Sequence, residues 1–332
     1  MNIAIIGAGA IGSVVAAYLT KAGIDSSIVG KEEQVKAISK NGLKISGIRG
    51  QEIVNVKVLT KLDKPYDLVI FTVKTQDLEE AYQHNVQFLD DCFVLTSQNG
   101  VQADNILGVH FEKERMLSSI VMFGATYINP GEIVFNFEGD WILGRPFSPV
   151  DAKIQEIAEI LRNCFNVVVS HNIMGMKYLK LFVNLNNCIP ALLGKSMQEV
   201  FMDMDFCKLS VNLLKEAVDI IKKAKIELVS LPQFPVDRIY GLSAMPLEQA
   251  AGVIHQSLTS LSREPLYGSI LQSILRGKES EIDFINGEIV CLAKQMRQSA
   301  PLNERVVDKV HQVQQNKKFF TPEEIKKEFH LN

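Results

Sequence analysis

Residues 2–12 read NIAIIGAGAIG, a short apolar run that ends in the pattern Gly7-x-Gly9-x-x-Gly12. The run predicts a buried strand, and the small and apolar residues of Ile11–Ala22 recur at helical spacing. A glycine pattern between a strand and a helix is typical of a dinucleotide-binding loop, whose glycines permit a tight turn, close approach of a pyrophosphate and close packing of the helix. The alternative is a strand–helix turn that binds nothing. The residues expected to hold a dinucleotide are Gly7, Ala8, Gly9, Ala10, Ile11 and Gly12.

Outward from this loop, the first half of the chain alternates short apolar strands with helical stretches. Continuously apolar strands joined by helices are typical of a parallel sheet that is covered on both faces. The turn signal Asn129-Pro130-Gly131 predicts a hairpin between two later strand-like segments. The predicted elements of this half are strands at Asn2–Ile6, Ser27–Val29, Leu68–Val73, Phe93–Thr96 and Val167–Val169, with a further helix at Ala152–Cys164.

After about Ser170 the strand signals stop, and the second half is predicted to be entirely helical. Near its end, Thr321 and Pro322 are residue types that favour the N-cap and the first position of a helix. The expected organisation is an α/β nucleotide-binding domain at 1–170, a helical domain at 171–315 and a tail helix within 316–332. The other predicted helices are Gly175–Leu193, Phe206–Lys225, Leu247–Ser262 and Glu281–Arg297.

Composition limits the classes of function. The 332 residues include 35 Lys and Arg against 38 Asp and Glu, and a net charge of −3 argues against nucleic acid as a main partner. No apolar run reaches the roughly 18–20 residues that span a bilayer, and the apolar start lacks the basic flank of a signal peptide. The simplest expectation is a cytoplasmic protein with no membrane partner. The five cysteines are scattered and the six histidines form no ligand-spaced pair, so neither a disulfide framework nor a metal site is expected.

A basic residue stands where a dinucleotide site selects its ribose. An acidic residue at the tip of the second strand would bind the 2′-hydroxyl, but here the tip reads Val29-Gly30-Lys31. Lys31 can pair with the 2′-phosphate of NADP, and Lys74, at the end of the third strand, is a second candidate for phosphate contact. The alternatives are a merely solvated Lys31, or an inward turn of Glu32 or Glu33.

Polar side chains in otherwise apolar surroundings are the candidates for chemistry. Asn99 follows the fourth strand and can hold a carboxamide or a substrate oxygen, although Asn-Gly is also an ordinary turn. Lys180 and Asn184 are four apart in a helix that is apolar all round, so they share a face, which continues to Cys188. Burial would lower the pKa of Lys180 toward the range useful for proton transfer. The alternative is a lysine that extends to solvent.

Acidic residues open the helix predicted at Glu281–Arg297. Helical spacing places Glu281, Ile285 and Glu288 on one face, with Asp283 elsewhere. A carboxylate near a helix N-terminus commonly offsets the helix dipole, which is the simpler explanation of these residues.

Together these segments resemble the ketopantoate reductase family, the 2-dehydropantoate 2-reductases. The resemblance extends from Met1 to about Gln314, and six segments in the correct order carry it: IAIIGAGAIGS, VGK, FTVKT, SQNG, KYLKLFVNLNN and SILQSILRGKESEIDFINGE. It implies a Rossmann domain followed by a helical domain like the C-terminal domain of 6-phosphogluconate dehydrogenase, with the active site in the cleft between them. It also implies reduction of a 2-keto acid by NADPH on the route to pantothenate. A helical second half can in addition supply a homodimer interface.

The resemblance also implies roles for individual residues. Lys180 would hold the keto oxygen and donate a proton as hydride arrives, which suits the chemistry because hydride addition builds negative charge on that oxygen. Glu281 would bind the terminal hydroxyl of the substrate. The further substrate-binding residues implied are Asn99, Asn184 and Ser269, and the basic cofactor-binding residues are Lys31, where the family usually has Arg, and Lys74.

Three departures from the family pattern concern the substrate. The family commonly has a second asparagine four residues after the first, where this chain has Cys188, and an aromatic residue that is often Trp is Tyr178. Residues 134–139 lack the expected His and Gly spacing. These differences leave open a paralogous reductase of another 2-oxo acid. A non-catalytic NADP-binding sensor is a further alternative, although a sensor has no need of a proton donor such as Lys180.

Overall fold

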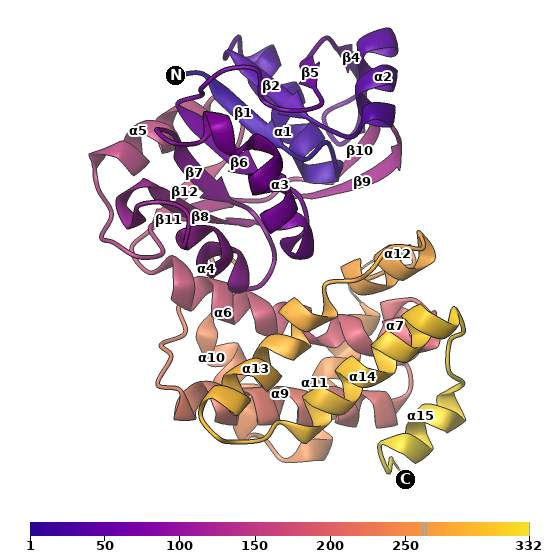
Figure 1. The fold of residues 1–332 in the computed structure, drawn as a ribbon. Coiled ribbons are helices and arrows are strands. Elements are labelled where there is room, and N and C mark those ends of the chain that lie inside the picture. The colour runs from indigo at the N-terminus through magenta and orange to yellow at the C-terminus, as the bar shows by residue number, and fades with distance from the viewer. Residues whose placement is uncertain (261, 263, 332) are drawn as a thin grey trace. The chain divides into compact units, whose positions relative to one another are not determined.

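The computed structural model describes residues 1–260, 262 and 264–331, and it divides into two compact units. Unit 1, Met1–Met174, contains the β-sheets, and unit 2, Gly175–Asn332, is helical (Figure 1). Strand pairing in the described part of unit 2 is limited to an isolated bridge between Leu231 and Phe234. The expectation of an α/β half followed by a helical half is therefore confirmed. Among the described residues, the helices are too short or too polar to cross a membrane.

The core of unit 1 is an eight-stranded sheet in the order β12-β11-β8-β7-β6-β1-β2-β5. Neighbouring strands run parallel except β8 and β11. This order places β1 between β2 and β6. The glycine loop that follows β1 therefore lies at the carboxyl ends of the strands, with a neighbouring strand on either side. The strands are β1 (Ile3–Ile6), β2 (Ser26–Val29), β5 (Lys57–Leu59), β6 (Leu68–Phe71), β7 (Phe93–Thr96), β8 (Met116–Val121), β11 (Trp141–Gly144) and β12 (Val167–Ser170).

The central strands are apolar along their whole length because both faces of the sheet are covered. Ile3 and Ile5 belong to a buried cluster with residues of α1 and α5, whereas Ala4 and Ile6 belong to a cluster with residues of α3 and α4. Successive side chains of a strand point to opposite faces, so the two clusters are the two covered faces. The helices of this unit are α1 (Ala10–Lys21), α2 (Glu32–Asn41), α3 (Leu78–Asn85), α4 (Gln102–Gly108) and α5 (Ala152–Arg162).

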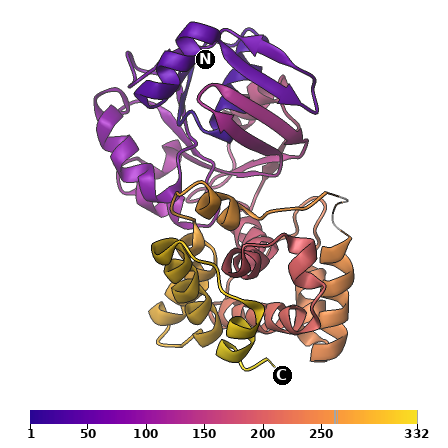
Figure 2. The same cartoon turned by 90° about the vertical axis from the view of Figure 1, so that its right-hand side faces the viewer.

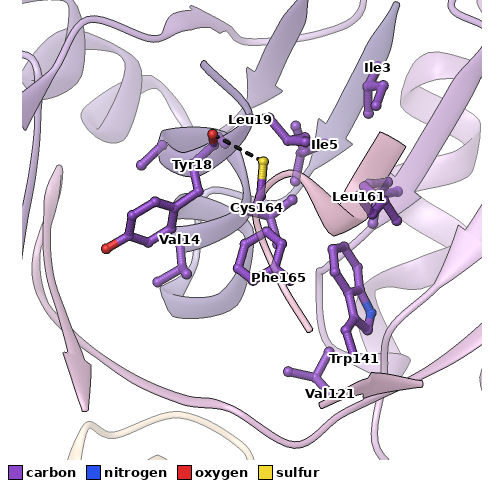
Figure 3. Packing of buried hydrophobic residues seen from close by; sticks show 14 of the residues in the cluster. Ile3, Ile5, Val14, Tyr18, Leu19, Val121, Trp141, Leu161, Cys164 and Phe165 are labelled. Carbon is purple, nitrogen blue, oxygen red and sulfur yellow. Dashed lines mark hydrogen bonds between the residues drawn. The ribbon is translucent and has the colours of Figure 1, made fainter. Parts of the chain in front are cut away.

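Aromatic rings fill the first of these clusters (Figure 3). The fully buried Trp141 meets the ring of Phe165 edge-on, with 5.3 Å between centroids. Tyr18 of α1 meets Phe165 edge-on at 6.0 Å, and its carbonyl accepts a hydrogen bond from the Cys164 thiol at 3.3 Å. Tyr18 also packs against Phe135 of the second sheet at 5.7 Å. These contacts fix α1, and with it the glycine loop, against the rest of unit 1.

A second sheet, of four strands, was not fully predicted. Its order is β4-β3-β10-β9, and β9 and β10 form the antiparallel hairpin expected around Asn129-Pro130-Gly131. Strands β3 and β4 were missed because their short segments, LKISG and EIV, are partly polar, and because β3 pairs in parallel with the distant β10. The strands are β3 (Leu43–Gly47), β4 (Glu52–Val54), β9 (Gly124–Asn129) and β10 (Glu132–Phe137).

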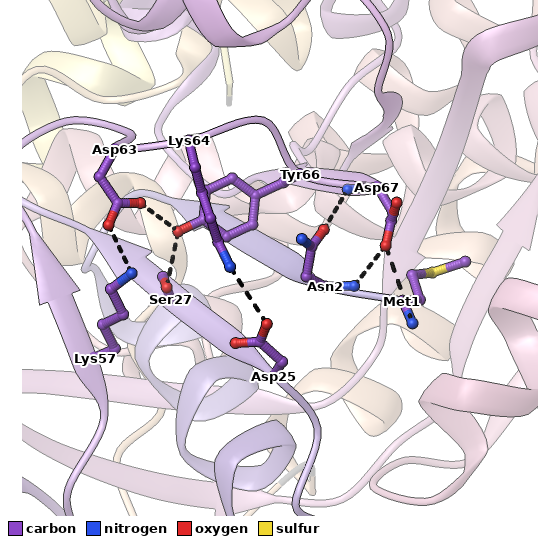
Figure 4. A network of polar contacts seen from close by, with 9 residues as sticks. All are labelled: Met1, Asn2, Asp25, Ser27, Lys57, Asp63, Lys64, Tyr66 and Asp67. Atoms are coloured by element: carbon purple, nitrogen blue, oxygen red, sulfur yellow. Dashed lines mark hydrogen bonds and ion pairs between the residues drawn. The ribbon is translucent and has the colours of Figure 1, made fainter.

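Polar contacts hold the amino ends of the main strands (Figure 4). Asn2, just before β1, and Asp67, just before β6, exchange two hydrogen bonds of 2.7 and 2.6 Å between backbone N–H groups and side-chain oxygens. Lys57 of β5 pairs with Asp63 at 2.6 Å, and the hydroxyl of Tyr66 contacts Asp63 at 2.9 Å. Side chains of the protein itself thus connect the amino ends of these strands, and the glycine loop lies at the opposite, carboxyl ends.

The helix predicted at Gly175–Leu193 is interrupted. α6 (Ile173–Asn184) ends in a 3-10 turn at Leu185–Asn187, here η4, before α7 (Cys188–Leu193) begins. Pro190 explains the tighter turn, because it has no N–H to donate to the carbonyl of Asn186 and its ring would crowd that carbonyl. The remaining helices of unit 2 are α8 (Met197–Phe201), α9 (Met204–Lys223), α10 (Val236–Ala244), α11 (Leu247–Thr259), α12 (Ser269–Leu275), α13 (Asn286–Gln295), α14 (Pro301–Asn316) and α15 (Pro322–Glu328).

The predicted helices Phe206–Lys225 and Ala152–Cys164 are observed as α9 and α5, with ends within two residues of those expected, whereas two others differ more. The helix expected to reach Ser262 ends at Thr259, and residue 261 lies outside the described residues. The segment from Glu281 begins as a 3-10 turn, η5 (Ile282–Phe284), and the non-helical backbone of Ile285, with φ −117° and ψ −87°, separates it from α13. The expected common face of Glu281, Ile285 and Glu288 is therefore wrong.

The tail helix α15 is confirmed. The hydroxyl of Thr321 accepts a hydrogen bond from the Glu324 N–H at 3.2 Å, and Pro322 is the first helical residue. Lys326 pairs with Asp203 at 2.7 Å and with Asp205 at 2.8 Å, so the helix lies against the start of α9 (Figure 2).

Candidate active site

The first and third glycines of the loop are required by the packing of the protein. Gly7 has φ +122°, and a Cβ there would lie 2.8 Å from the backbone nitrogen of Val73. A Cβ on Gly12 would lie 2.0 Å from the carbonyl oxygen of Gly7 and 2.3 Å from Thr72 Oγ1. Without these side chains, the turn between β1 and α1 can lie against the residues after β6, where Thr72 Oγ1 donates to the Gly7 carbonyl at 2.8 Å, as the glycine pattern predicts.

Gly9 has a different reason to be glycine. It is the N-cap of α1 with φ −80°, a backbone that alanine also adopts, and among the described residues no heavy atom outside its chain neighbours and helix turn lies within 4 Å of its ideal Cβ. The first turn of α1 carries no acidic side chain, so its N–H groups favour an anion. The open space at Gly9 therefore fits the close approach of a pyrophosphate, and no steric contact among the described residues requires glycine there.

Gln34, which was not singled out from the sequence, joins the glycine loop to the tip of β2. Its Nε2 donates to the carbonyl of Ala8 at 2.7 Å, and its Oε1 accepts from the Lys31 N–H at 2.9 Å. A Cβ on Gly30 would lie 2.7 Å from the Cβ of Ala8. The available signal was its place three residues after the N-cap, where Glu and Gln complete a capping box.

Lys31 lies at the N-cap of α2 with an exposed side chain. The neighbouring Glu32 is exposed and pairs with Lys36 at 3.3 Å along the helix, and Glu33 is also exposed. The carboxylate of Glu32 is therefore engaged on the outside of α2. Lys31 is the first charged residue after β2.

The polar residues after β6 and β7 meet at the same sheet edge as the glycine loop. Ser97 Oγ donates to the carbonyl of Phe71 at 2.7 Å, and Gln98 Nε2 donates to the same carbonyl at 2.9 Å. These bonds fasten the loop that carries the half-buried Asn99. The half-buried Lys74 is the N-cap of a 3-10 turn, η1 (Thr75–Asp77), three residues after β6 ends at Phe71. Because β1, β6 and β7 are adjacent and parallel, the structure brings the cofactor candidates of unit 1 together.

In unit 2, the charges of Lys180 and Glu281 interact. Lys180 lies on α6 with a half-buried side chain, and Glu281, also half-buried, precedes η5. Burial, followed by the positive charge of Lys177, lowers the pKa of Lys180 to about 8, and the negative charge of Glu281 opposes this shift. The pair predicted from two distant segments is therefore close enough to be coupled, and the lysine is suited to proton transfer near neutral pH.

Asn184 and Ser269 approach the same turn, and Asn187 lies between them. Asn187 Nδ2 donates to Asn184 Oδ1 at 3.4 Å, and a Cβ on Gly268, the residue before Ser269, would lie 2.6 Å from Asn187 Oδ1. Asn187 is 8% exposed. It was not singled out from the sequence, although two adjacent asparagines at the end of an apolar helix were an available signal.

Cys188 does not continue the face of Lys180 and Asn184. The η4 turn changes the helical phase, and the Cys188 side chain is fully buried, with its thiol donating to the Leu185 carbonyl at 3.0 Å. Burial raises the pKa of the thiol to about 12. Cys188 is thus a neutral core residue in this protein.

No metal-binding arrangement of three or more His, Cys, Asp or Glu side chains occurs in the described part of the chain. Asp283, whose role the sequence left open, pairs with His311 at 2.9 Å. The five cysteines are free thiols.

Two family models cover most of the chain. The description "ketopantoate reductase PanE/ApbA" matches residues 3–146, and its C-terminal counterpart matches residues 172–314. The chain belongs to the ketopantoate reductase family. A relative, the 2-dehydropantoate 2-reductase of Pyrococcus horikoshii, is 32% identical over 309 residues, which cover 91% of this chain and 94% of the relative.

Solved structures show the ketopantoate reductase fold as well. A PanE/ApbA family ketopantoate reductase from Ralstonia eutropha JMP134 has a TM-score of 0.80 and 23% identity, covering 95% of this chain and 99% of that one. A D-mandelate dehydrogenase with NADH and anilino(oxo)acetate has a TM-score of 0.82 and 23% identity, with the same coverage. The chain is therefore an oxidoreductase of the ketopantoate reductase type, from a family that binds a nicotinamide cofactor.

A test of the loop compares two glycines whose Cβ positions are open. Gly9→Ala should raise the Kd for NADPH by at least roughly tenfold, because a methyl group at a helix N-terminus blocks close approach of the pyrophosphate, while the apoprotein stays folded, with only the small fall in melting temperature that a poorer N-cap gives. Gly252→Ala, in α11, is the matched control, since it too meets open space, and it should leave NADPH binding as it is. Tight NADPH binding by Gly9→Ala, measured by fluorescence titration, would show that the loop does not cradle the cofactor.

Proposed function

We propose that this protein reduces 2-dehydropantoate (ketopantoate) to pantoate with NADPH, and that Lys180 is the general acid. The observation that carries the proposal is the half-buried Lys180 with a pKa of about 8, coupled to the carboxylate of Glu281. Membership of the ketopantoate reductase family supports the substrate class.

Lys180 acts on the keto oxygen of the substrate. NADPH, when bound, supplies the hydride that adds to the keto carbon. The ammonium of Lys180 donates a hydrogen bond to the keto oxygen, stabilises the negative charge that develops on it and transfers one proton to it. The lysine leaves the step neutral and takes a proton back from solvent. The lowered pKa makes this proton easier to give, and the charge of Glu281 keeps the lysine largely protonated at neutral pH.

The remaining polar groups hold the substrate. Glu281 accepts a hydrogen bond from its terminal hydroxyl, and Asn184, Ser269 and Asn99 donate to its oxygens. Ser269 is exposed, and Asn184 and Asn99 are half-buried, so all three are accessible to a ligand. Each of these groups is neutral or anionic, which leaves Lys180 as the cation that neutralises the developing oxyanion.

The cofactor preference is proposed from the charges at the tip of β2. Lys31 pairs with the 2′-phosphate of NADPH, and Lys74 is a second phosphate-binding cation. The supporting observation is that Glu32, the carboxylate next to Lys31, is paired with Lys36.

A second candidate is reduction of a different 2-oxo acid. It is favoured by Cys188, which is buried as a neutral thiol at the position where the family commonly has a second asparagine. This candidate keeps the cofactor, Lys180 and the chemistry, and changes the substrate alone.

Steady-state NADPH oxidation with several oxo acids tests the function. Ketopantoate should give a kcat/KM about 10- to 100-fold above that of 2-oxoisovalerate, because only ketopantoate offers a terminal hydroxyl to the charged Glu281, and pyruvate and oxaloacetate should be slower still. Glu281→Gln should bring the kcat/KM for ketopantoate closer to that for 2-oxoisovalerate. Any effect of this change on Lys180 acts on both substrates equally and therefore does not alter the ratio of the two values. Preference for another acid would establish the second candidate, and no oxidation with any acid despite tight NADPH binding would leave a sensor.

Charge reversal at the strand tip tests the cofactor preference. Lys31→Glu should lower kcat/KM for NADPH by about 10- to 100-fold and shift the preference toward NADH, because a charge-assisted contact to the 2′-phosphate is replaced by repulsion. Lys40→Glu makes the same charge change at the exposed far end of α2 and should leave the ratio alone. An unchanged ratio in Lys31→Glu would mean that Lys31 is only a surface residue.

A further inference from the structure

We infer that Asn187 is a positioning residue, which fixes the carboxamide of Asn184 so that its amide nitrogen faces the substrate, an inference that rests on the proposed function. The evidence is a hydrogen bond from Asn187 Nδ2 to Asn184 Oδ1 of 3.4 Å and the near-complete burial of Asn187, which is 8% exposed.

The two neighbouring asparagines of η4 point to different elements. Asn186 Oδ1 accepts a hydrogen bond from Ser210 Oγ of α9 at 2.5 Å, whereas the side chain of Asn187 lies against the backbone at Gly268. A Cβ on Gly268 would lie 2.6 Å from Asn187 Oδ1 and 2.8 Å from its Cγ. Gly268 therefore leaves just enough room for the amide of Asn187, which is held between α12 and η4 and has little freedom to rotate.

This restraint decides which end of the Asn184 carboxamide is offered to a ligand. A carboxamide has an acceptor oxygen and a donor nitrogen at opposite ends. The oxygen of Asn184 is engaged by Asn187, and within the described residues Asn184 Nδ2 has no hydrogen-bond acceptor. The donor is therefore the atom left for a substrate oxygen.

A donor is what the proposed substrate requires. A 2-oxo acid presents a carboxylate and a keto oxygen, which only accept hydrogen bonds. With Cys188 buried in the core, Asn184 is the amide of this helix that remains for substrate, so its orientation matters. Were the amide rotated, its oxygen would face an anion, and the contact would become repulsive.

The test is a pair of isosteric charge changes on η4. Asn187→Asp cannot donate to Asn184; its carboxylate accepts from Asn184 Nδ2 instead and turns the Asn184 oxygen toward the substrate. We expect the KM for the preferred oxo acid to rise about 10- to 100-fold, with kcat and the KM for NADPH nearly unchanged. Asn186→Asp is the control, because a carboxylate at 186 still accepts from Ser210, and its KM should equal that of the wild type. Asn187→Ala, which buries no charge, should raise the KM about 3- to 10-fold and serves if Asn187→Asp fails to fold.

A double-mutant cycle separates positioning from direct contact. If Asn187 acts through Asn184, then Asn187→Ala has no further effect on KM in an Asn184→Ala background. Additive effects would instead mean that Asn187 touches the substrate itself, and a wild-type KM in both Asn187 variants would also overturn the inference. Each variant is compared on the oxo acid that the wild type reduces fastest, so failure at Asn187 is distinct from failure of the proposed function, in which the wild type reduces none.

Discussion

The half-buried ammonium of Lys180 is the constraint on which the candidate site of the helical unit depends. Removing Lys180 from water destabilises its charge, and the pKa of about 8 reflects that cost. The negative charge of Glu281 partly offsets this cost and raises the pKa of Lys180. The positive charge of Lys177, a residue that is 2% exposed, lowers that pKa. The balance leaves a cation that is present at neutral pH and can lose its proton easily. Such a group lowers stability, and under the proposed function this loss is offset by its use in chemistry on a carbonyl oxygen.

The sheet unit is organised around a different constraint, the close approach of backbone segments at the carboxyl ends of β1 and β6. Gly7 and Gly12 allow this approach, and Gln34 connects the resulting loop to the tip of β2. Meanwhile the amino ends of the strands are closed by pairs such as Asn2 with Asp67. At the amino ends of the strands, polar groups of the protein bind one another. At the carboxyl ends, N–H groups and lysines are suited to binding phosphate. Ligands of open α/β sheets generally bind at the carboxyl ends of the strands.

Local patterns predicted what local forces determine. The strand Phe93–Thr96 and the capped start of α15 agree with the structure to the residue, because continuous burial and helix capping leave direct marks on sequence. The second sheet was predicted only at its hairpin, since the parallel pairing of β3 with β10 depends on distant segments. The breaks at η4 and η5 were missed for another reason, because hydrophobic spacing continues through a 3-10 turn. Pro190 was a sequence signal for the first break, whereas only the backbone geometry of Ile285 shows the second.

The candidate site divides in the same way. Motifs with a fixed spacing, such as the glycine loop and the Lys180–Asn184 pair, could be found from the sequence. Gln34 and Asn187 left only weak signals, a capping-box position and a pair of adjacent asparagines, because a carboxamide acquires its role from the group it faces, here Ala8 and Asn184. Cys188 shows the converse, since its spacing suggested the substrate side and the η4 turn directs it into the core.

The pH dependence of kcat/KM for oxo-acid reduction, measured on the wild type and on Lys180→Ala, tests the central claim most directly. A general acid with a pKa of about 8 must be protonated, so the wild-type value should be level near neutral pH and fall about tenfold per unit well above pH 8. Lys180→Ala should be slower by about 10²- to 10⁴-fold and should lack this fall. A variant that keeps near wild-type rates, or the same decline at high pH, would contradict the assignment of Lys180 as the proton donor.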